Sequence, residues 1–321
     1  MKLNRGRTCF FGQALAALTT LCLPFLAHAQ APAPSAAKAT EPMTELRVQN
    51  VRTGLNVITG AGGNVVVWSG ADGVVLVDTG LAASSAALVD AVTRISAAPV
   101  RFVINTHGHA DHAGGNEAFA RKGAVLIGHE SLREHGGRDP AVPAANAEAS
   151  TIAPAARPVL TTMEAVALHL NGDRLDAVHV ADAHTASDIV VRWNDADVVA
   201  LGDIYWNGQY PYIDVESGGS LAGTVAAIEA ALARSNARTV VVPGHGPVSS
   251  RAELAVYRDM LVAVGRNVRE AVEQGEGIEA ILAAKPTAEF DARFGRPGAL
   301  VTPEEFVRSI YRDLAPKRPG R

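Results

Sequence analysis

A run of three histidines and one aspartate at residues 107–112 constrains the fold more than any other feature of this sequence. The run reads His-Gly-His-Ala-Asp-His and directly follows a stretch of apolar and β-branched residues that is typical of a buried strand. Where a chain leaves a strand in extended form, residues two apart face the same way, so His107 and His109 can reach one metal ion together. Asp111 and His112 then point toward a neighbouring position. Imidazole and carboxylate groups suit Zn²⁺, with Fe and Mn as alternatives, so the sequence predicts a metal site at the end of a strand.

The rest of the chain alternates short apolar strands with amphipathic helices, in a rhythm that repeats roughly before and after residue 170. Helical spacing of apolar residues predicts further helices in residues 251–321, packed on the same domain. The pattern predicts an α/β (α+β) sandwich that is rich in strands. The strands are expected at 65–68, 74–77, 100–105, 124–128, 165–170, 176–180, 189–193, 198–201 and 238–242, and the main helices at 84–95 and 220–235.

The N-terminal segment has the layout of a secretory signal. Three cationic residues precede a short apolar run at 14–26, and residues 27–29 (Ala-His-Ala) fit the small-x-small rule for signal peptidase. Residues 1–29 are therefore expected to be a Sec-type signal peptide that is cleaved after Ala29, with an uncleaved anchor as the alternative. An Ala- and Pro-rich segment at 30–45 follows as a flexible lead-in. We expect a periplasmic or secreted protein that has no stable membrane insertion after cleavage.

Charge and cysteine content exclude several classes of partner and ligand. The chain has 29 Lys and Arg against 33 Asp and Glu, and it becomes more acidic once the cationic leader is removed. A mildly acidic surface gives no electrostatic reason to bind nucleic acid or anionic membranes. Cys9 and Cys22 are the only cysteines and both lie in the leader, so the mature chain has neither disulfides nor thiolate ligands. The expected partner is a small-molecule substrate, and the sequence makes no prediction of oligomeric state.

The histidine run and four later motifs together resemble the metallo-β-lactamase superfamily, over roughly residues 46–250. The resemblance implies a four-layer αββα sandwich with metals at one edge between the two sheets. The later motifs fall in the order that the family has: a hairpin at 64–80 ending in Val-Asp-Thr-Gly, Ala-His-Thr at 183–185, Leu-Gly-Asp at 201–203 and Pro-Gly-His-Gly at 243–246.

Carried over position by position, the resemblance implies a site for two Zn²⁺ ions. His107, His109 and His184 would hold the first ion. The second would be held by Asp111, His112 and His245, with Asp203 bridging the two ions. Asp111 would also be the catalytic residue that orients the nucleophile.

Four further residues are candidates for supporting roles. Asp78, which follows a strand of the hairpin, is expected either to orient a ligand histidine from behind or to cap the next turn. Trp206, Tyr210 and Tyr212 come just after the expected bridging aspartate. They are expected either to form one wall of the substrate cleft or to pack under the helices.

The resemblance implies a metal-dependent hydrolase, in which a hydroxide bound by two zinc ions cleaves a small amide, lactam, lactone or ester. Without a cysteine the chain departs from the family's cysteine-ligand β-lactamases. With Asp203 it is more similar to the glyoxalase II and lactonase branch than to the all-histidine β-lactamases. The alternatives are a mononuclear-iron oxidoreductase resembling the persulfide dioxygenases and a non-catalytic periplasmic accessory protein.

Overall fold

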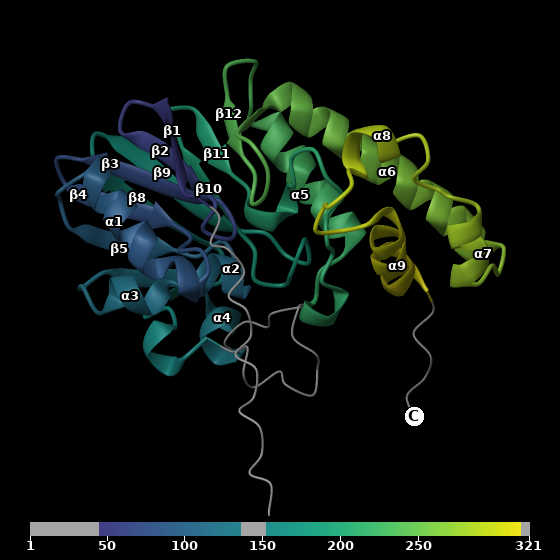
Figure 1. Cartoon of the computed structure of the whole chain (residues 1–321), viewed down its shortest axis with the longest axis horizontal. Coiled ribbons are helices and arrows are strands. Elements are labelled where there is room, and N and C mark those ends of the chain that lie inside the picture. Colours follow the sequence, from purple (N-terminus) through teal and green to yellow (C-terminus); the bar gives the residue numbers. More distant parts are fainter. Residues whose placement is uncertain (1–44, 136–151, 316–321) are drawn as a thin grey trace, which may run out of the picture. The chain divides into compact units, whose positions relative to one another are not determined.

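The computed structural model describes residues 45–135 and 152–315, which form two β-sheets and the helices that flank them (Figure 1). The predicted signal peptide and nearly all of the lead-in lie outside the described residues. The first sheet contains, in spatial order, β1 (Arg47–Arg52), β2 (Leu55–Thr59), β3 (Val65–Gly70), β4 (Gly73–Val77), β5 (Val100–Ile104), β6 (Val125–His129) and β7 (Leu160–Thr162). The second contains β13 (Ser249–Ser250), β12 (Val240–Val242), β11 (Val198–Ala200), β10 (Ile189–Trp193), β9 (Asp173–His179) and β8 (Ala165–Leu170).

The two sheets pack face to face over an apolar layer. Alternate residues of each strand point into this layer, as the period of two in an extended chain requires. Trp68 of β3 and Trp193 of β10 meet there edge to face, with ring centroids 6.2 Å apart. Valine, leucine, isoleucine and alanine side chains fill the rest, and most of them are fully buried.

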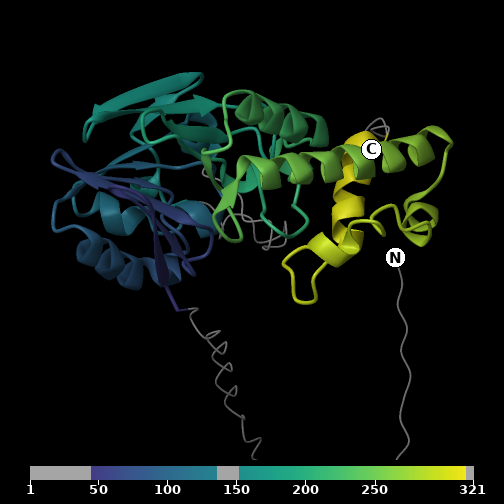
Figure 2. The same cartoon turned by 90° about the horizontal axis from the view of Figure 1, so that it is seen from above.

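Helices cover the outer face of each sheet, and together they complete the predicted αββα sandwich, which the structure confirms (Figure 2). On the first sheet lie α1 (Ser85–Ile95) and α3 (Asn116–Ala120), whose buried apolar side chains pack on β3, β4 and β5. On the second lie α5 (Leu221–Ala233) and the long helix α6 (Arg251–Glu273). The short helices α2 (Ala110–Ala113) and α4 (Glu130–His135) follow β5 and β6.

Three more helices follow α6 and share its core. They are α7 (Ile278–Ala283), α8 (Asp291–Phe294) and α9 (Pro303–Leu314). A capping box starts α9: the Thr302 hydroxyl accepts the Glu305 N–H, and the Glu305 carboxylate accepts the Thr302 N–H. Phe306 and Ile310 of α9 are fully buried against α6 and the segment after β11. No helix within residues 45–135 and 152–315 is long and apolar enough to cross a membrane.

Strand direction brings the predicted ligands to one edge of the sandwich. In the first sheet β4, β5 and β6 run parallel, so the turns that follow them lie side by side. In the second sheet β11 and β12 run parallel and β10 is antiparallel to β11, so the ends of β11 and β12 lie beside the start of β10. The residues that follow β4, β5, β11 and β12, and those that precede β10, are thereby gathered at one edge.

Candidate metal centre

Four buried side chains form the first ligand group, which contains His107, His109, His184 and Asp203. His107 follows β5, and its Nε2 lies 3.1 Å from Nδ1 of His109. His184 comes from the β9–β10 connection and places its Nε2 3.0 Å from the same Nδ1 atom. Oδ2 of Asp203 lies 3.9 Å from His107 Nε2 and 3.7 Å from His184 Nε2.

A second group contains Asp111, His112 and His245, and it shares Asp203 with the first. His245 Nε2 lies 3.1 Å from Oδ2 of Asp111 and 3.5 Å from Nε2 of His112. Asp203 in the short 3₁₀ helix Gly202–Ile204 is 3.0 Å from His112 Nε2 through Oδ1 and 3.4 Å from His245 Nε2 through Oδ2. The structure therefore brings together all seven residues that the sequence predicts as ligands, with Asp203 between the two groups.

Each of three histidines has one ring nitrogen that faces away from the centre and makes a hydrogen bond there. The partner of that hydrogen bond decides which nitrogen of the ring carries the hydrogen. His184 Nδ1 lies 2.8 Å from the Tyr212 carbonyl oxygen, which can only accept, so this nitrogen carries the hydrogen. The His109 Nε2–H donates in the same way to Asp214 Oδ2 at 3.0 Å, and the His112 Nδ1–H to Asp78 Oδ2 at 2.8 Å. The other nitrogen of each ring faces the centre, and in the neutral form of the ring its lone pair is available to a metal ion.

Asp78 connects the two ligand groups from behind. Its carboxylate accepts both the backbone N–H and the hydroxyl of Thr106, each at 2.7 Å, besides the His112 imidazole. The Thr106 oxygen in turn lies 3.1 Å from Nδ1 of His107 and accepts its hydrogen. One buried carboxylate thus orients a histidine of each group. The alternative role, a cap on the next turn, is not seen, because the 3₁₀ helix Ala82–Ser84 begins after Leu81 and has no side-chain cap.

The donor set fits divalent metal ions. Nitrogen and oxygen ligands of a tetrahedral zinc ion lie about 2.0–2.2 Å from the ion, and therefore about 3.4 Å from one another. The distances between ligand atoms in the two groups, 3.0–3.9 Å, lie on both sides of this value. Asp203 Oδ1 is buried and has no hydrogen-bond partner among the described residues, although His112 Nε2 lies 3.0 Å away. A buried carboxylate oxygen without a hydrogen-bond donor is costly unless a cation lies beside it.

The electrostatics of the site keep Asp111 and Asp203 ionised, because neighbouring histidines lower the pKa of both carboxyl groups. Burial alone would raise the pKa of Asp111, but the neighbouring His112 and His245 outweigh it and lower that pKa to about 2. Burial lowers the pKa of His184 to about 4, which keeps this imidazole neutral at pH 7. For His245 burial is outweighed by Asp203 and Asp111, which raise its pKa to about 9. A metal ion would displace that proton, so metal binding should release protons near neutral pH.

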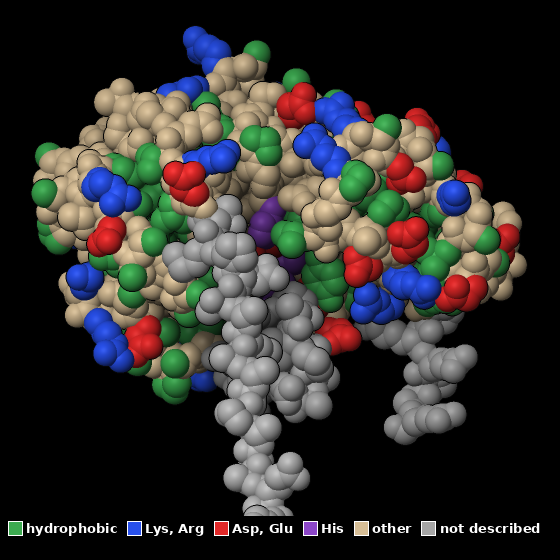
Figure 3. Space-filling model, viewed as in Figure 1, with side chains coloured by type: hydrophobic (Ala, Val, Ile, Leu, Met, Phe, Trp, Pro, Cys, Tyr) green, Lys and Arg blue, Asp and Glu red, His purple; other side chains and the backbone are tan. Residues whose placement is uncertain are grey.

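The two ligand groups open into a pocket of about 540 Å³. Figure 3 shows histidine side chains at the bottom of a hollow between the sandwich and the C-terminal helices. A pocket of this size accommodates a small organic molecule. Its described lining consists of Leu81, His109, Asp111, His184, Asp203, Trp206, Tyr212, His245, Leu300, Val301, Glu305 and Arg312.

Two of the three predicted aromatic wall residues line this pocket, and the third does not. Trp206 stacks on His245 with ring centroids 4.3 Å apart, and Tyr212 lies beside His184. The prediction for Tyr210 as a wall residue was wrong. Its ring is fully buried and stacks on Phe306 of α9 at 5.0 Å, so it packs under the helices instead.

Sequence reasoning missed several residues that support the ligands. Thr106 and Asp214 bind the ligand histidines through hydrogen bonds, as described above. Asp188 holds the turn after His184 by accepting the Thr185 N–H at 2.8 Å and its hydroxyl at 2.9 Å, and burial raises its pKa to about 7. The only available signal was position: Thr106 immediately precedes the histidine run, and Asp188 lies four residues after His184. The pocket-lining residues of α9 carried no signal of this kind.

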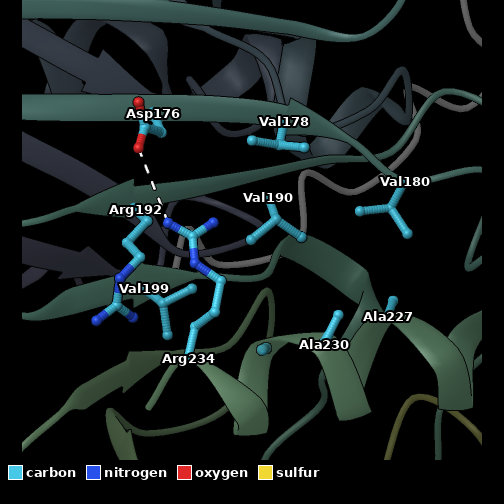
Figure 4. A pocket seen from close by; sticks show the side chains of 10 residues that line it. Asp176, Val178, Val180, Val190, Arg192, Val199, Ala227, Ala230 and Arg234 are labelled. Atoms are coloured by element: carbon cyan, nitrogen blue, oxygen red, sulfur yellow. Dashed lines mark ion pairs between the residues drawn. The ribbon is translucent and has the colours of Figure 1, made fainter.

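A second cavity lies between α5 and the outer face of the second sheet (Figure 4). Its volume is about 90 Å³, and valines and alanines form most of its lining. The charged residues at one end include Arg234 and Asp176, which face each other at 3.9 Å. Its described lining contains no histidine.

Comparison with known proteins agrees with the fold and the motifs. A family model described as the metallo-beta-lactamase superfamily matches residues 58–245, which is more than half of the chain, and confirms the family resemblance. No curated protein sequence matches significantly.

Several solved structures are similar. A metallo-beta-lactamase from Pontibacter korlensis is 22% identical with a TM-score of 0.56, over 68% of this chain and 99% of that one. The stereoselective inverting sec-alkylsulfatase Pisa1 from Pseudomonas sp. is 19% identical with a TM-score of 0.64, over 83% of this chain. This chain spans only half of that longer protein. The BLEG-1 B3 metallo-beta-lactamase is 20% identical with a TM-score of 0.52, over 62% of this chain and 94% of that one. At these identities the likeness shows the shared fold alone.

Proposed function

Because this chain belongs to the metallo-beta-lactamase superfamily, we propose that it is a metal-dependent hydrolase with two zinc ions, which cleaves a small amide, lactam, lactone or ester. The observation that carries the proposal is the position of Asp203. Its two carboxylate oxygens lie within 3.0–3.9 Å of ligand nitrogens from both groups. A carboxylate placed in this way can be shared by two cations, and two-metal sites are a recurrent solution for hydrolysis.

The chain's own residues divide the work of such a reaction. Two zinc ions, when bound, supply a nucleophile at neutral pH and polarise the oxygen of the bond that is attacked. The five ligand histidines would hold the ions in the orientation that Asp78, Asp214 and the Tyr212 carbonyl fix from behind. Asp111, whose side chain is 30% exposed to the pocket, would accept a hydrogen bond from the attacking water through Oδ2 and so orient it.

The completeness of the site favours hydrolysis over the two alternatives. A mononuclear-iron oxidoreductase would need only the first group, whereas Asp111, His112 and His245 form a second group of buried or half-buried ligands. An accessory protein without activity would have no need to preserve both groups and the hydrogen bonds behind them. The proposed place of action is the periplasm or the cell exterior, supported by the leader sequence. Mass spectrometry of the mature chain tests this, because its N-terminus should be Gln30.

The experiment that tests the proposed function is a hydrolysis assay on zinc-loaded protein. The substrates are nitrocefin, a simple lactone and a p-nitrophenyl ester, each assayed before and after removal of metal by a chelator. We expect zinc-dependent hydrolysis, with kcat/KM for the lactone or ester above that for nitrocefin. A larger kcat/KM for nitrocefin than for every lactone and ester would contradict the substrate assignment. Oxygen consumption with a persulfide by protein containing one iron would replace hydrolysis with oxidation.

A further inference from the structure

The pocket has one wall from outside the superfamily match, because helix α9 and the residues just before it line the pocket opposite the metal ligands. Leu300, Val301, Glu305 and Arg312 belong to this wall, whereas the family match ends at residue 245. We propose that Arg312 is a specificity-determining residue, and that it selects substrates in which an acidic group sits on an apolar body. This inference rests on the proposed function, since it names the substrate class of the same site.

Helix α9 is fixed firmly enough to act as a wall. Phe306 stacks on Tyr210, which lies seven residues after the bridging Asp203. At the other end of the helix, the Asp313 carboxylate accepts the backbone N–H of Leu221 at 2.9 Å, which ties α9 to the start of α5. Because both anchors are buried or half-buried, the side chains that α9 presents to the pocket have a defined position relative to the metal ligands.

The charge of Arg312 is available to a ligand. Its described contact is a hydrogen bond from Nε to the Arg308 carbonyl oxygen at 3.3 Å, and among residues 45–135 and 152–315 no carboxylate lies within ion-pair distance of its guanidinium. Arg308, one turn earlier, is engaged differently, since its guanidinium lies 3.0 Å from the Glu279 carboxylate. An unpaired guanidinium on a pocket wall offers two parallel N–H donors to a carboxylate or a sulfate.

The acidic residue of this wall is already engaged. Glu305 lines the same pocket two turns before Arg312, about 10 Å away along the helix axis. Its Oε2 accepts the Thr302 N–H at 2.8 Å in the capping box. Glu305 therefore repels an anion at the start of the helix, while Arg312 attracts it near the end, and this places the acidic group of the substrate toward the C-terminal part of α9.

The apolar part of the substrate class follows from two exposed leucines. Leu81 is 39% exposed and comes from the turn after β4, and Leu300 is 68% exposed and precedes α9. Large apolar side chains exposed in a pocket mark surface that a ligand can cover. Together with Trp206 and Tyr212 they form much of the apolar lining of the pocket that contains the metal ligands and Arg312.

A matched pair of esters tests the proposal. Mono-p-nitrophenyl adipate carries a free carboxylate, and its methyl ester is the neutral counterpart with the same reacting bond. In zinc-loaded protein, Arg312→Gln should reduce the ratio of kcat/KM for the acidic ester to that for the neutral ester about tenfold, mainly through KM, because a charge-assisted hydrogen bond is lost. Arg308→Gln, the matched control on the same helix, should leave the ratio unchanged, and Arg312→Lys should restore part of it.

Glu305→Gln gives a prediction of the opposite sign. The amide keeps the capping box but removes the negative charge, so the ratio should rise two- to threefold. An unchanged ratio in Arg312→Gln, or an equal fall in Arg308→Gln, would overturn the inference and leave the proposed function standing.

A binding measurement separates this inference from the proposed function. Whether or not the esters are hydrolysed, the same variants are titrated by calorimetry with 4-phenylbutyrate and with 4-phenylbutan-1-ol. A roughly tenfold weaker affinity for the acid in Arg312→Gln, with unchanged affinity for the alcohol, would support the role of Arg312 without reference to activity. Equal affinities of wild type and variant for the acid would contradict it.

Discussion

The two sides of the pocket are built in different ways. At the ligand edge nearly every side chain is buried and hydrogen-bonded, and its position is set by turns that follow parallel strands. The α9 wall presents exposed side chains, such as Leu300 at 68%, and its position is set by apolar packing more than 100 residues farther along the chain from the histidine run. Under the two proposals, the ligand residues would determine which reaction the site supports, and the α9 wall would determine which substrate is bound. Changes at the edge should alter metal binding, and changes at the wall should alter selectivity.

The largest effect is expected from the residue shared by both ligand groups. Asp203→Asn removes the negative charge that lies between them and should reduce kcat/KM about a thousandfold or more. Asp195→Asn, in the exposed turn after β10, is the matched control and should behave as wild type. Steady-state hydrolysis of a p-nitrophenyl ester measures both. Activity within tenfold of wild type in Asp203→Asn would contradict the proposal that Asp203 is needed to hold the metal ions.

A substitution at a residue that is not itself a ligand should also weaken metal binding. A methyl group on Gly244 would collide with Oδ1 of Asp203, because the two segments approach too closely for any side chain. Gly244→Ala should therefore lower zinc affinity about a hundredfold while circular dichroism stays that of a folded protein. Gly277→Ala, at the start of α7, has no neighbour within reach and serves as the control. Unaltered zinc affinity in Gly244→Ala would mean that Asp203 is held less tightly than described.

Asp78 should show a smaller effect of the same kind. Asp78→Asn disturbs the hydrogen bonds that orient His112 directly and His107 through Thr106. Loss of such an orienting partner typically costs 10- to 100-fold in metal affinity, and we expect about that loss in competition titrations with a zinc chelator. Asp90→Asn on the exposed side of α1 controls for the loss of one charge. If Asp78→Asn binds zinc as tightly as the control, the carboxylate has only a structural role.

Substitutions of Tyr210 should have the smallest effect on metal binding, but they should weaken the packing of the α9 wall. Tyr210→Phe removes the hydrogen bonds to Asp291 and Thr287 and should cost about 1 kcal/mol of unfolding free energy. Tyr210→Ala also removes the contact with Phe306 and should cost about 3–5 kcal/mol. Zinc affinity should be unchanged in both, while KM for the acidic ester rises in Tyr210→Ala. A loss of zinc affinity in either variant would show that metal binding at the ligand edge depends on the packing of the α9 wall.

The metal ligands were well predicted from the sequence because each of them lies in a short motif of neighbouring residues. Alternation in an extended chain places His107 and His109 together, and the family's motif order supplied His184, Asp203 and His245. Thr106 and Asp214 were missed because their roles depend on which histidine nitrogen they meet in space. Nothing in the sequence near either residue specifies that contact.

The wall was poorly predicted because its contacts join distant segments. For Tyr210 the sequence left two roles open, in the cleft wall or under the helices, because its environment is decided by Phe306, 96 residues farther along the chain. Ser250 and Glu253, which have the residue types and spacing of a capping box, give a second example. Ser250 caps α6 as that pattern suggests, but the Glu253 carboxylate turns to Arg293 instead of completing the box. A pattern of residue types cannot weigh a local hydrogen bond against a distant ion pair.

The central claim is that Asp203 joins two ligand groups into one centre for two metal ions, and counting the metal tests it most directly. Purified wild-type protein, and the Asp203→Asn variant prepared in the same way, would be analysed by inductively coupled plasma mass spectrometry. We expect about two zinc ions per wild-type chain and no more than one in the variant. One iron per chain, or no metal after dialysis against zinc, would contradict it.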